Sequence, residues 1–407
     1  MPLIVQKYGG TSVGTPDRIV NISRRILETQ RAGNSVVAVV SAMSGVTDSL
    51  IKLSKQVSPK PTDREMDVLL ATGEQTTIAL VAMAIDALGG RAISLTGAQA
   101  GIRTDGIHTK AKIANVSPRQ IRSYLRDGFI CVVAGFQGQT VAGRITTLGR
   151  GGSDLTAIAV AAALRADNCE IYTDVDGIYT CDPRVVPAAR KIDTITYDEL
   201  LEMASSGSKV MQSRSVEFAK KFRVPFEVRS SFNTNRGTTV KEETPGLEDV
   251  VVRGVSIERN QAKVTIKGVP DRPGAASRIF TQLNDAHVVV DVIVQNVSAQ
   301  GSTDISFTMN RDELDKMGHL LDKVVAEIGA GPVEKQAGIA KLSVVGIGMR
   351  SHSGVAAKLF EALASGGVNI QMISTSEIKI AVIIDELRIE DAARLAHSAF
   401  GLDAAAA

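Results

Sequence analysis

The sequence predicts an α/β protein with a mostly parallel sheet sandwiched by helices, followed by two smaller α+β units. Three observations lead to this prediction. Runs rich in valine and isoleucine alternate with segments of helical periodicity up to about residue 240. The composition then changes to Asn, Thr, Gly, Glu and Pro over residues 233–248, which we interpret as a linker. An internal repeat occupies the remaining third of the 407 residues.

The elements of the first part follow from its apolar runs. We expect strands over residues 3–6, 35–41, 92–95, 129–134, 170–173 and 225–229. Helical patterns cover residues 16–30, 65–88, 117–127, 154–164 and 197–222, the last with a break near 205–207. Because the strands are apolar at consecutive positions, both faces of the sheet should be covered. Ligands of such sheets bind beyond the carboxyl ends of the strands, where most of the polar motifs fall.

The last third contains one small α+β unit twice. Residues 262–266 (Ala-Lys-Val-Thr-Ile) match residues 340–344 (Ala-Lys-Leu-Ser-Val), and residues 290–293 match residues 368–371. Between these strands each copy has a glycine-containing turn and a helical pattern. Neither copy is large enough to build a generous core alone, so we expect the two to pack together or against another subunit.

Composition excludes several classes of protein. The chain has 44% hydrophobic and 22% charged residues, a net charge of +2, 4% aromatic residues and no tryptophan, which gives no reason to expect nucleic acid or a membrane surface as partner. Its three cysteines have no metal-ligand spacing and favour a reduced, cytoplasmic protein. We expect neither a signal peptide nor an apolar run of the roughly 20 residues that span a bilayer.

The first polar motif is a glycine turn that carries a lysine. Residues 7–14 read Lys-Tyr-Gly-Gly-Thr-Ser-Val-Gly and lie between an expected strand and an expected helix. Backbone N–H groups at such a turn point outward, glycine lets an anion approach closely, and Lys7 adds a positive charge. The motif favours a phosphate site, although strand-Gly-Gly-helix turns also occur for purely structural reasons.

A second glycine turn opens the alanine-rich helix that follows it. Residues 147–154 read Thr-Leu-Gly-Arg-Gly-Gly-Ser-Asp. Arg150 supplies a planar cation for a carboxylate or a phosphate, and Ser153 or Asp154 suits the helix N-cap. Three glycines around an arginine at a helix start favour anion binding over a plain capped turn.

An acidic loop follows the expected strand at residues 170–173. It contains Asp174, Asp176 and Asp182. Next to a bound polyphosphate these carboxylates would hold Mg²⁺ through water, because Mg²⁺ usually takes few protein ligands. The spacing and the missing final glutamate exclude an EF-hand.

Two weaker motifs complete the set. Glu74 lies in a Thr-Gly-Glu sequence within an apolar helical pattern, where it faces either solvent or a cleft in which it would bind an ammonium group. The hydroxyls of Ser41, Ser44 and Thr47 line the loop after an expected strand.

Other phosphate-binding and hydrolytic motifs are missing from the sequence. There is no P-loop and no Gly-x-Gly-x-x-Gly after a strand, and the five histidines lie outside the motifs above. A histidine base or metal ligand is therefore not expected. Two anion-binding turns, an acidic loop and a lysine on an α/β sheet suit phosphoryl transfer, in which catalysis is mainly positioning and charge neutralisation.

Taken together, residues 7–12, 41–43, 72–74, 149–154 and 173–177 resemble the motifs of the aspartate kinases, a branch of the amino acid kinase family. The repeat resembles the tandem ACT domains of their regulatory region, so the resemblance runs from residue 3 to about residue 400. It implies a catalytic domain over residues 1–245 and ACT-like units, of ferredoxin-like fold, over residues 262–338 and 339–403, the second completed by residues 249–261.

The resemblance implies ATP-dependent phosphorylation of the β-carboxylate of L-aspartate to 4-phospho-L-aspartate, the first step of lysine, threonine and methionine synthesis. Lys7 would neutralise the transferring phosphoryl group, and Asp174 would organise this lysine and the phosphates that carry Mg²⁺, with no protein ligand bound directly to the metal. The implied ATP-binding residues are Lys7, Tyr8, Gly9, Gly10, Ser12, Thr173, Asp174, Tyr179, Asp182, Arg184 and Lys209. The implied substrate-binding residues are Ser41, Thr47, Glu74, Arg150, Gly151, Gly152, Ser153 and Asp154, with Arg150 on a carboxylate and Glu74 on the α-ammonium group.

The resemblance also implies regulation. In ACT-like units an amino acid binds at the turn between the first strand and the helix, across a subunit interface. The implied effector-binding residues are Asp271, Gly274, Ala275, Gln295 and Asn296. Residues 350–354 form the equivalent turn of the second copy but lack the aspartate. We expect feedback inhibition by lysine, threonine or both, and a homodimer or higher oligomer through the ACT units, with or without a separate regulatory subunit. The alternative is a dimerisation module without a ligand.

Two rival functions are considered. The first is another amino acid kinase, acting on glutamate, acetylglutamate or carbamate, against which the Thr-Gly-Glu context of Glu74 and the ACT-like repeat argue. The second is a regulatory amino-acid-binding protein with an inactive kinase half, against which the presence of Lys7 and Asp174 argues.

Overall fold

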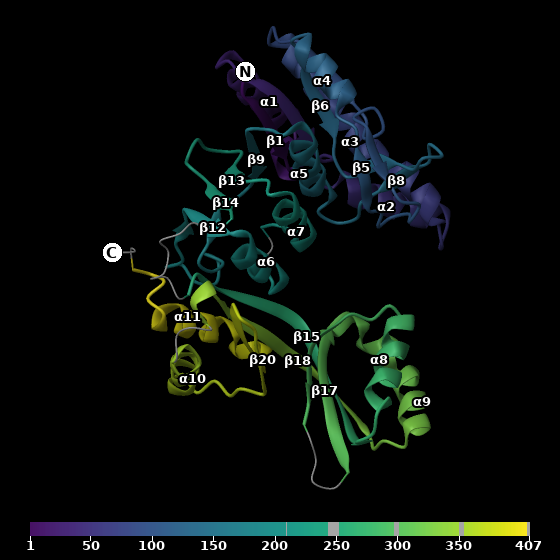
Figure 1. Cartoon of the computed structure of the whole chain (residues 1–407), viewed down its shortest axis with the longest axis vertical. Helices are drawn as coiled ribbons and strands as arrows, with labels where there is room; N and C mark the ends of the chain where they lie inside the picture. Colours follow the sequence, from purple (N-terminus) through teal and green to yellow (C-terminus); the bar gives the residue numbers. More distant parts are fainter. Residues whose placement is uncertain (209, 243–251, 297–300, 350–353, 405–407) are drawn as a thin grey trace. The chain divides into compact units, whose positions relative to one another are not determined.

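The computed structural model describes residues 1–208, 210–242, 252–296, 301–349 and 354–404 (Figure 1). The chain divides into two compact units, which we describe one at a time. The first comprises Met1–Tyr179, Lys191–Ser205 and Lys209–Gly246. The second comprises Thr180–Arg190, Ser206–Ser208 and Leu247–Ala407.

The first unit is built on an eight-stranded sheet of order β12-β14-β13-β9-β1-β2-β6-β3. Neighbouring strands are parallel except that β14 runs antiparallel to β13. All six expected strands are present. The strands are β1 (Leu3–Tyr8), β2 (Ser35–Val40), β3 (Ala92–Leu95), β6 (Ile130–Ala134), β9 (Asn168–Thr173), β12 (Thr194–Thr196), β13 (Phe226–Ser230) and β14 (Thr238–Lys241).

The expected linker over residues 233–248 is partly wrong, because β14 lies inside it. Thr238, Thr239 and Val240 pair with Val228, Glu227 and Phe226 of β13 and extend the sheet. Residues 243–248 lie outside the described residues. A short strand rich in threonine gives too little apolar pattern to be distinguished from a polar connection.

Helices cover both faces of this sheet, as the consecutive apolar positions predict. Ile19, Ile22 and Ile26 of α1 pack with α3 over one face, and α5 packs against β1, β2 and β9. Helix α2 was not expected. The helices are α1 (Pro16–Arg31), α2 (Val46–Val57), α3 (Asp63–Ala87), α4 (Arg119–Arg126), α5 (Gly152–Leu164), α6 (Tyr197–Ser205) and α7 (Ser213–Phe222), with a 3-10 turn η1 (Gly10–Val13).

Helix α3 has nearly the bounds expected from its helical pattern, residues 65–88, and is strongly apolar. By length and composition it would be able to cross a membrane, with an 18-residue window of mean hydropathy 1.6. However, 44% of that window is buried inside the fold, and the helix packs on α1, β3, β6 and a further strand, β8 (Ile145–Thr147). A core helix of this kind passes the same compositional test as a membrane span.

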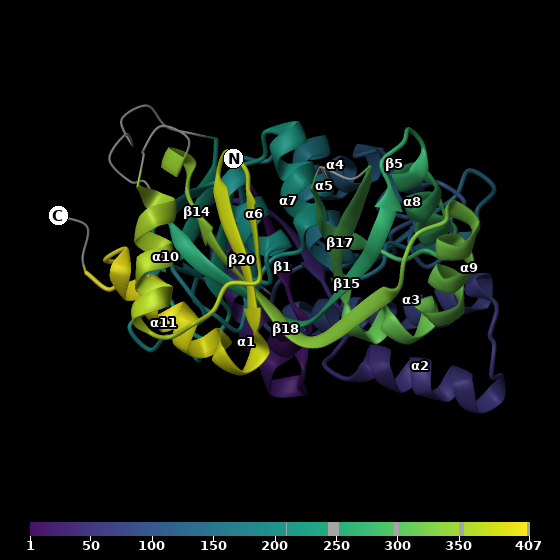
Figure 2. The ribbon, with the colours of Figure 1, turned by 90° about the horizontal axis from the view of Figure 1, so that it is seen from below.

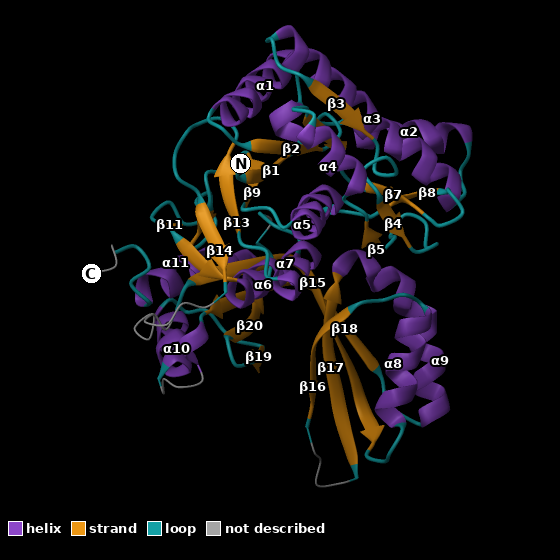
Figure 3. Cartoon of the chain, turned by 45° about the horizontal axis from the view of Figure 1, so that its top comes forward, coloured by secondary structure: helices purple, strands orange, loops and turns teal. Residues whose placement is uncertain are grey.

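Two small sheets flank the main one. The first has the order β5-β4-β7-β8 and lies beside α3 and α5 (Figure 3). Its strands are β4 (Ile102–Thr104), β5 (Ile113–Val116), β7 (Gln137–Gln139) and β8 (Ile145–Thr147). The second pairs β10 (Ile178–Tyr179) with β11 (Lys191–Ile192).

The second unit is one antiparallel sheet of order β16-β17-β15-β18-β20-β19, in which both repeat copies take part. Its strands are β15 (Gly254–Pro270), β16 (Val290–Gln295), β17 (Ser302–Asn310), β18 (Val333–Val345), β19 (Met372–Thr375) and β20 (Lys379–Asp385). Its helices are α8 (Ala275–Asp285), α9 (Gly318–Ile328), α10 (Val355–Ser365) and α11 (Ile389–Ala399), with 3-10 turns η2 (Arg311–Met317), η3 (Ile347–Met349) and η4 (Glu386–Arg388).

Two long strands join the copies (Figure 2). Residues 254–258 of β15 pair with residues 341–345 of β18 in the second copy, while residues 263–266 pair with residues 333–336 in the first. The second copy is therefore completed by a strand that precedes the first copy in the chain. Each copy also has a second helix, α9 or α11, that the repeat comparison did not reveal.

The excursion Thr180–Arg190 belongs to the core of the second unit. Cys181, Val185 and Val186 pack with the apolar residues of the second copy. The Thr180 hydroxyl lies 2.9 Å from Nε2 of buried His397 on α11, and Arg394 donates to the Val185 carbonyl at 2.9 Å. Of the three aspartates of the expected acidic loop, Asp174 and Asp176 thus belong to the first unit and Asp182 to the second.

Candidate active site

The predicted substrate-binding residues and part of the predicted ATP-binding residues gather at the carboxyl edge of the main sheet. In the register of the parallel strands, Tyr8 at the end of β1 lies beside Val40 of β2 and Tyr172 of β9. The loops that follow these strands therefore emerge side by side. This placement is the expected one, because the motifs follow the strands of a mostly parallel sheet and ligands of open α/β sheets bind at this edge.

A pocket of about 280 Å³ opens here. It brings together the β1 turn, the loop after β2, helix α3 and the glycine turn before α5. All eight predicted substrate-binding residues line it, as do Lys7 and Gly10 of the predicted ATP-binding set. The remaining lining residues are Ala42, Met43, Ser44, Gly45, Phe136 and Gly149.

Lys7 forms an ion pair inside this pocket with Asp154 on α5. The two atoms, Nζ and Oδ1, are 2.6 Å apart, and the side chains are 10% and 12% exposed. We expected Asp174 to organise the lysine, but the carboxylate against Lys7 is Asp154. Asp174 is exposed after β9 and accepts a hydrogen bond from the Thr173 hydroxyl at 3.0 Å. Lys7 is thus a buried cation held by one carboxylate at the pocket wall.

Glu74 points into the pocket, so the choice between solvent and cleft is settled in favour of the cleft. Its carboxylate is 4% exposed, and Oε1 accepts a hydrogen bond from the Ala42 amide at 3.1 Å. Oε2 is buried without a hydrogen-bond partner among the described residues. Burial raises the pKa of Glu74 from 4.5 to about 7. A buried carboxylate with one free oxygen suits a ligand that brings its own cation.

Arg150 stands at the tip of the second glycine turn. Gly149 and Gly151 on either side have φ values of 77° and 73°, in the left-handed region that favours glycine. A Cβ on Gly151 would also lie 2.1 Å from Cγ of Gln212, so no larger residue fits there. The turn leads directly into α5, whose N-terminus adds N–H donors to the arginine charge.

The predicted ATP-binding residues are only partly brought together. Gly9, Gly10, Ser12 and Thr173 lie at the same sheet edge, and the Ser12 hydroxyl is hydrogen-bonded to that of Ser231 at 2.8 Å. The side chain of Tyr8 is fully buried in a stack with Tyr172, 4.8 Å between ring centroids, so only its backbone is available to a ligand.

The other members of this set lie elsewhere. Tyr179 donates to Asp176 at 2.6 Å, and this hydrogen bond is the main cause that lowers the pKa of Asp176. Asp182 and Arg184 pair with each other at 2.7 Å and belong to the second unit. Lys209 lies outside the described residues.

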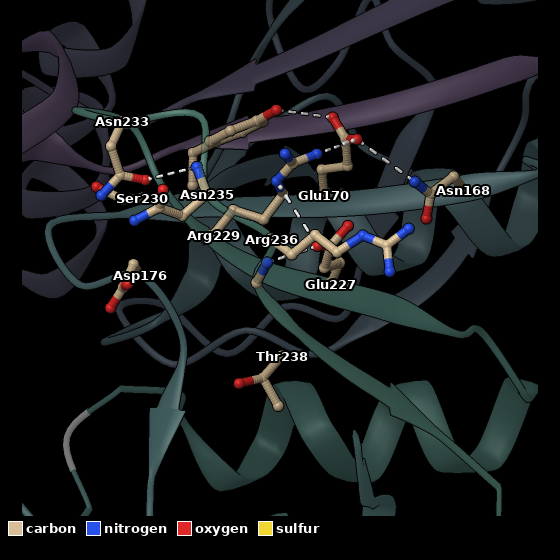
Figure 4. A network of polar contacts seen from close by, with 12 residues as sticks. Asn168, Glu170, Asp176, Glu227, Arg229, Ser230, Asn233, Asn235, Arg236 and Thr238 are labelled. Atoms are coloured by element: carbon tan, nitrogen blue, oxygen red, sulfur yellow. Dashed lines mark hydrogen bonds and ion pairs between the residues drawn. The ribbon is translucent and has the colours of Figure 1, made fainter. Parts of the chain in front are cut away.

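A buried polar network supports the strands that carry the site (Figure 4). Its centre is Glu170 on β9, which is 7% exposed and accepts hydrogen bonds from Gln6 at 2.8 Å, Tyr172 at 3.0 Å and Arg229 at 3.3 Å. These contacts join β1, β9 and β13 on the face opposite to Lys7, because side chains alternate along a strand. The sequence analysis missed this network.

The predicted effector residues follow strands that end at the same edge of the sheet in the second unit. Asp271 follows β15, and Gln295 and Asn296 end or follow β16, which runs in the same direction because both strands pair antiparallel with β17. Gly274, with a φ of 94°, precedes α8. Gly354 occupies the matching place before α10 with a φ of 104°, while residues 350–353 lie outside the described residues.

Two residues behind the pocket were also missed. Asp67 on α3 is fully buried and contacts His108, although the sequence analysis placed all histidines away from the site. The only signal in the sequence is the spacing of seven residues between Asp67 and Glu74, which puts both on one face of a helix.

Comparison with known proteins agrees with this geometry. Residues 2–230 match the model of the amino acid kinase family, and residues 342–400 match that of an ACT domain. An aspartokinase of Pseudomonas aeruginosa is 52% identical over 408 aligned residues, which cover 100% of this chain and 99% of the relative.

Solved structures agree as well. E. coli aspartokinase III in complex with aspartate and ADP (R-state) has a TM-score of 0.81 at 26% identity, covering 98% of this chain and 99% of the other. The same enzyme in complex with lysine and aspartate (T-state) has a TM-score of 0.76 at 26% identity, covering 97% and 99%. With a full-length relative above 50% identity and a family model over more than half of its residues, the chain belongs to the amino acid kinase family, and within it to the aspartokinases.

Proposed function

We propose that the chain transfers the γ-phosphoryl group of ATP to the β-carboxylate of L-aspartate and so makes 4-phospho-L-aspartate. The observation that carries this proposal is that Glu74 and Arg150 both line one pocket, which Lys7 lines as well. An amino acid with two carboxylates needs one fixed carboxylate for its ammonium group and one fixed cation for a carboxylate. The product would enter lysine, threonine and methionine synthesis in the cytoplasm.

In the proposed reaction, an oxygen of the substrate β-carboxylate attacks the γ-phosphorus, and the bond to the bridging oxygen of ADP breaks. The acceptor is already ionised, so no proton has to be removed from it. The catalytic task is therefore to neutralise charge on the transferring group. Lys7 would do this, while Asp154 fixes the position of its ammonium group through the 2.6 Å ion pair.

The nucleotide would approach the turn after β1, where the backbone N–H of Gly10 would serve as a donor, since that of Gly9 already donates to the Tyr172 carbonyl at 3.2 Å. Mg²⁺, carried by the phosphates, would add positive charge to the same group. The donor chemistry of the acidic loop fits this arrangement. Asp176 is engaged by Tyr179 and by Lys191 at 3.6 Å, whereas Asp174 is exposed and would face a metal-bound water.

Glu74 and Arg150 would set specificity. The free oxygen of Glu74 would accept from the α-ammonium group of aspartate, which pairs a buried carboxylate that has no hydrogen-bond partner for this oxygen among the described residues. Arg150 would hold a substrate carboxylate in two hydrogen bonds, and the hydroxyls of Ser41, Thr47 and Ser153 would complete the pocket.

The test is ADP release with aspartate compared with glutamate, acetylglutamate and carbamate as acceptors. We expect turnover with aspartate and much less with the others. Lys7→Ala should abolish turnover while the far-ultraviolet circular dichroism spectrum stays unchanged. Turnover that does not depend on aspartate, or near-normal activity of the variant, would contradict the proposal.

We further infer that the second unit inhibits the enzyme when lysine, threonine or both bind at Asp271, Gly274, Ala275, Gln295 and Asn296, in a homodimer or higher oligomer. Support comes from the common orientation of β15 and β16 and from E. coli aspartokinase III, which was solved with lysine. Activity should be titrated with each amino acid alone and with both together. Asp271→Ala should relieve the inhibition, and inhibition that persists in this variant would move the effector site elsewhere.

A further inference from the structure

A second buried carboxylate lies on the same helix as Glu74 but does not line the pocket. Asp67 is fully buried. It precedes Glu74 by seven residues, which is two helical turns or about 10 Å along α3 on the same face. Unlike Glu74, both of its oxygens have hydrogen-bond partners.

Asp67 binds two segments that are far from it in the chain. Its Oδ1 accepts from the Thr147 hydroxyl at 2.5 Å, at the end of β8. The Thr109 amide donates to both oxygens, at 3.0 and 3.2 Å, and Nδ1 of His108 lies 2.5 Å from Oδ2. A fully buried carboxylate thus ties α3 to β8 and to the loop before β5.

One of these segments is held in an unfavourable conformation. Thr109 has a φ of 63°, in the left-handed region that a β-branched residue rarely adopts. Such a conformation persists only where surrounding contacts enforce it. The two hydrogen bonds from its amide to Asp67 are such contacts.

Both segments support the turn that presents Arg150. Thr147 precedes Gly149 by two residues, and its carbonyl accepts from the Ala111 amide at 2.9 Å. The Thr109 carbonyl oxygen packs against Gly149: it lies 3.2 Å from the position that a Cβ atom on Gly149 would take. The Arg150 guanidinium itself makes no hydrogen bond or ion pair with any residue that the structure describes. The position of Arg150 therefore depends on the turn beneath it.

We propose that Asp67 is a positioning residue for substrate recognition, because it sets the place of the Arg150 turn relative to Glu74. Helix α3 would then position both binding groups of the pocket. It carries Glu74 directly, and through Asp67 it holds the turn that carries Arg150. The inference rests on the proposed function, in which Arg150 binds a carboxylate of aspartate.

The test compares three variants by steady-state kinetics with aspartate and with ATP as the varied substrate. Asp67→Asn keeps the shape but removes the charge, and Thr147→Val removes one hydroxyl with little change in volume. Losing a hydrogen bond to a charged group costs roughly tenfold to hundredfold, and only part of this loss should reach the Arg150 turn. We therefore expect the KM for aspartate to rise about tenfold in Asp67→Asn and about threefold to tenfold in Thr147→Val. The KM for ATP should stay within about twofold.

Glu170→Gln is the matched control. Glu170 is also a buried, multiply hydrogen-bonded carboxylate of the same unit, but it touches no residue of the pocket. This variant should lose stability without a change in the KM for aspartate. In an Arg150→Lys background, Asp67→Asn should have much less effect than in the wild type, because residues that act through one group are not additive.

The outcomes separate the inference from the proposed function. A wild-type enzyme that does not use aspartate would overturn the proposed function and, with it, this inference. Wild-type turnover with aspartate, together with an unchanged KM in Asp67→Asn, would overturn the inference alone. Equal losses for both substrates, or an equal effect of Glu170→Gln, would reduce Asp67 to a stabilising residue. If Asp67→Asn does not fold, the Thr147→Val result decides between these outcomes.

Discussion

Glu74 should lower the free energy of unfolding of the first unit at neutral and alkaline pH, although it binds the ammonium group of the substrate in the proposed reaction. The perturbation is Glu74→Gln, which keeps the shape and still accepts the hydrogen bond from the Ala42 amide. The folded chain raises the pKa of Glu74 from 4.5 to about 7 through burial. At about 1.4 kcal/mol per pKa unit, this difference corresponds to about 3 kcal/mol.

The number of protons bound by the folded and unfolded chains decides whether the free energy of unfolding rises or falls with pH. Between pH 4.5 and about 7 the folded chain holds a proton on Glu74 that the unfolded chain has released, so the free energy of unfolding falls as the pH rises through this window. Above it, the whole penalty is present. Glu74→Gln should therefore be more stable than the wild type by about 3 kcal/mol at pH 8 and nearly equal to it at pH 4.

The assay is thermal unfolding of the full chain from pH 4 to 8, followed by a probe of the first unit. For a unit of this size, the gain corresponds to a shift of roughly 6–12 °C at pH 8. Glu65→Gln is the control, because this residue is exposed on the same helix and should change little. In parallel, kcat/KM for aspartate should fall about tenfold per pH unit below about 7 in the wild type, since only the ionised carboxylate binds ammonium.

Two results would refute the reasoning. If Glu74→Gln has the same pH dependence of stability as the wild type, burial does not perturb this carboxyl group. If the variant keeps its kcat/KM for aspartate at pH 8, Glu74 does not bind the ammonium group of the substrate.

Two further predictions concern the second unit. Lys341 is 2% exposed and pairs with Glu258 at 2.7 Å and with Asp291. Lys341→Met should lower the free energy of unfolding by about 1–3 kcal/mol in urea titrations, which is less than the loss expected when the remaining partners are fully buried. The loss should exceed that of the control Lys263→Met, which removes the matching lysine of the first copy. Burial lowers the pKa of His397 below 6.5, so folding favours the neutral form and stability should be lost as the pH falls below 6.5. His397→Gln should weaken this acid sensitivity in unfolding curves measured at pH 5 and 7. The same difference between pH 5 and 7 in the variant and the wild type would contradict this prediction.

The sequence predicted the main sheet because its signal is local. Six strands with consecutive apolar residues and the helices between them were placed within a few residues of their bounds. The order of motifs along the chain then put Lys7, Ser41 and Thr173 at one edge of the sheet, since parallel strands end on the same side. Fold and pocket followed from periodicity and connectivity.

What the sequence did not predict depends on contacts between distant residues. The Asp67 carboxylate meets His108 and Thr147, which are 41 and 80 positions away. Residues 180–190 read as a loop in the sequence, yet Cys181, Val185 and Val186 supply part of an apolar core whose other buried members begin at residue 252. No periodicity marks such residues, because each is polar or stands in an apolar run too short to form a pattern.

The two carboxylates of α3 show how hydrogen bonding separates a binding group from a supporting one. Both are buried on the same face of the same helix. Asp67 is surrounded by donors from the protein, so folding alone satisfies it. Glu74 retains one buried oxygen without a partner among the described residues, a cost that folding leaves in place. Such a cost is offset only by a ligand that brings a donor, so the residue that destabilises the empty pocket is the one that gives it affinity for an ammonium group.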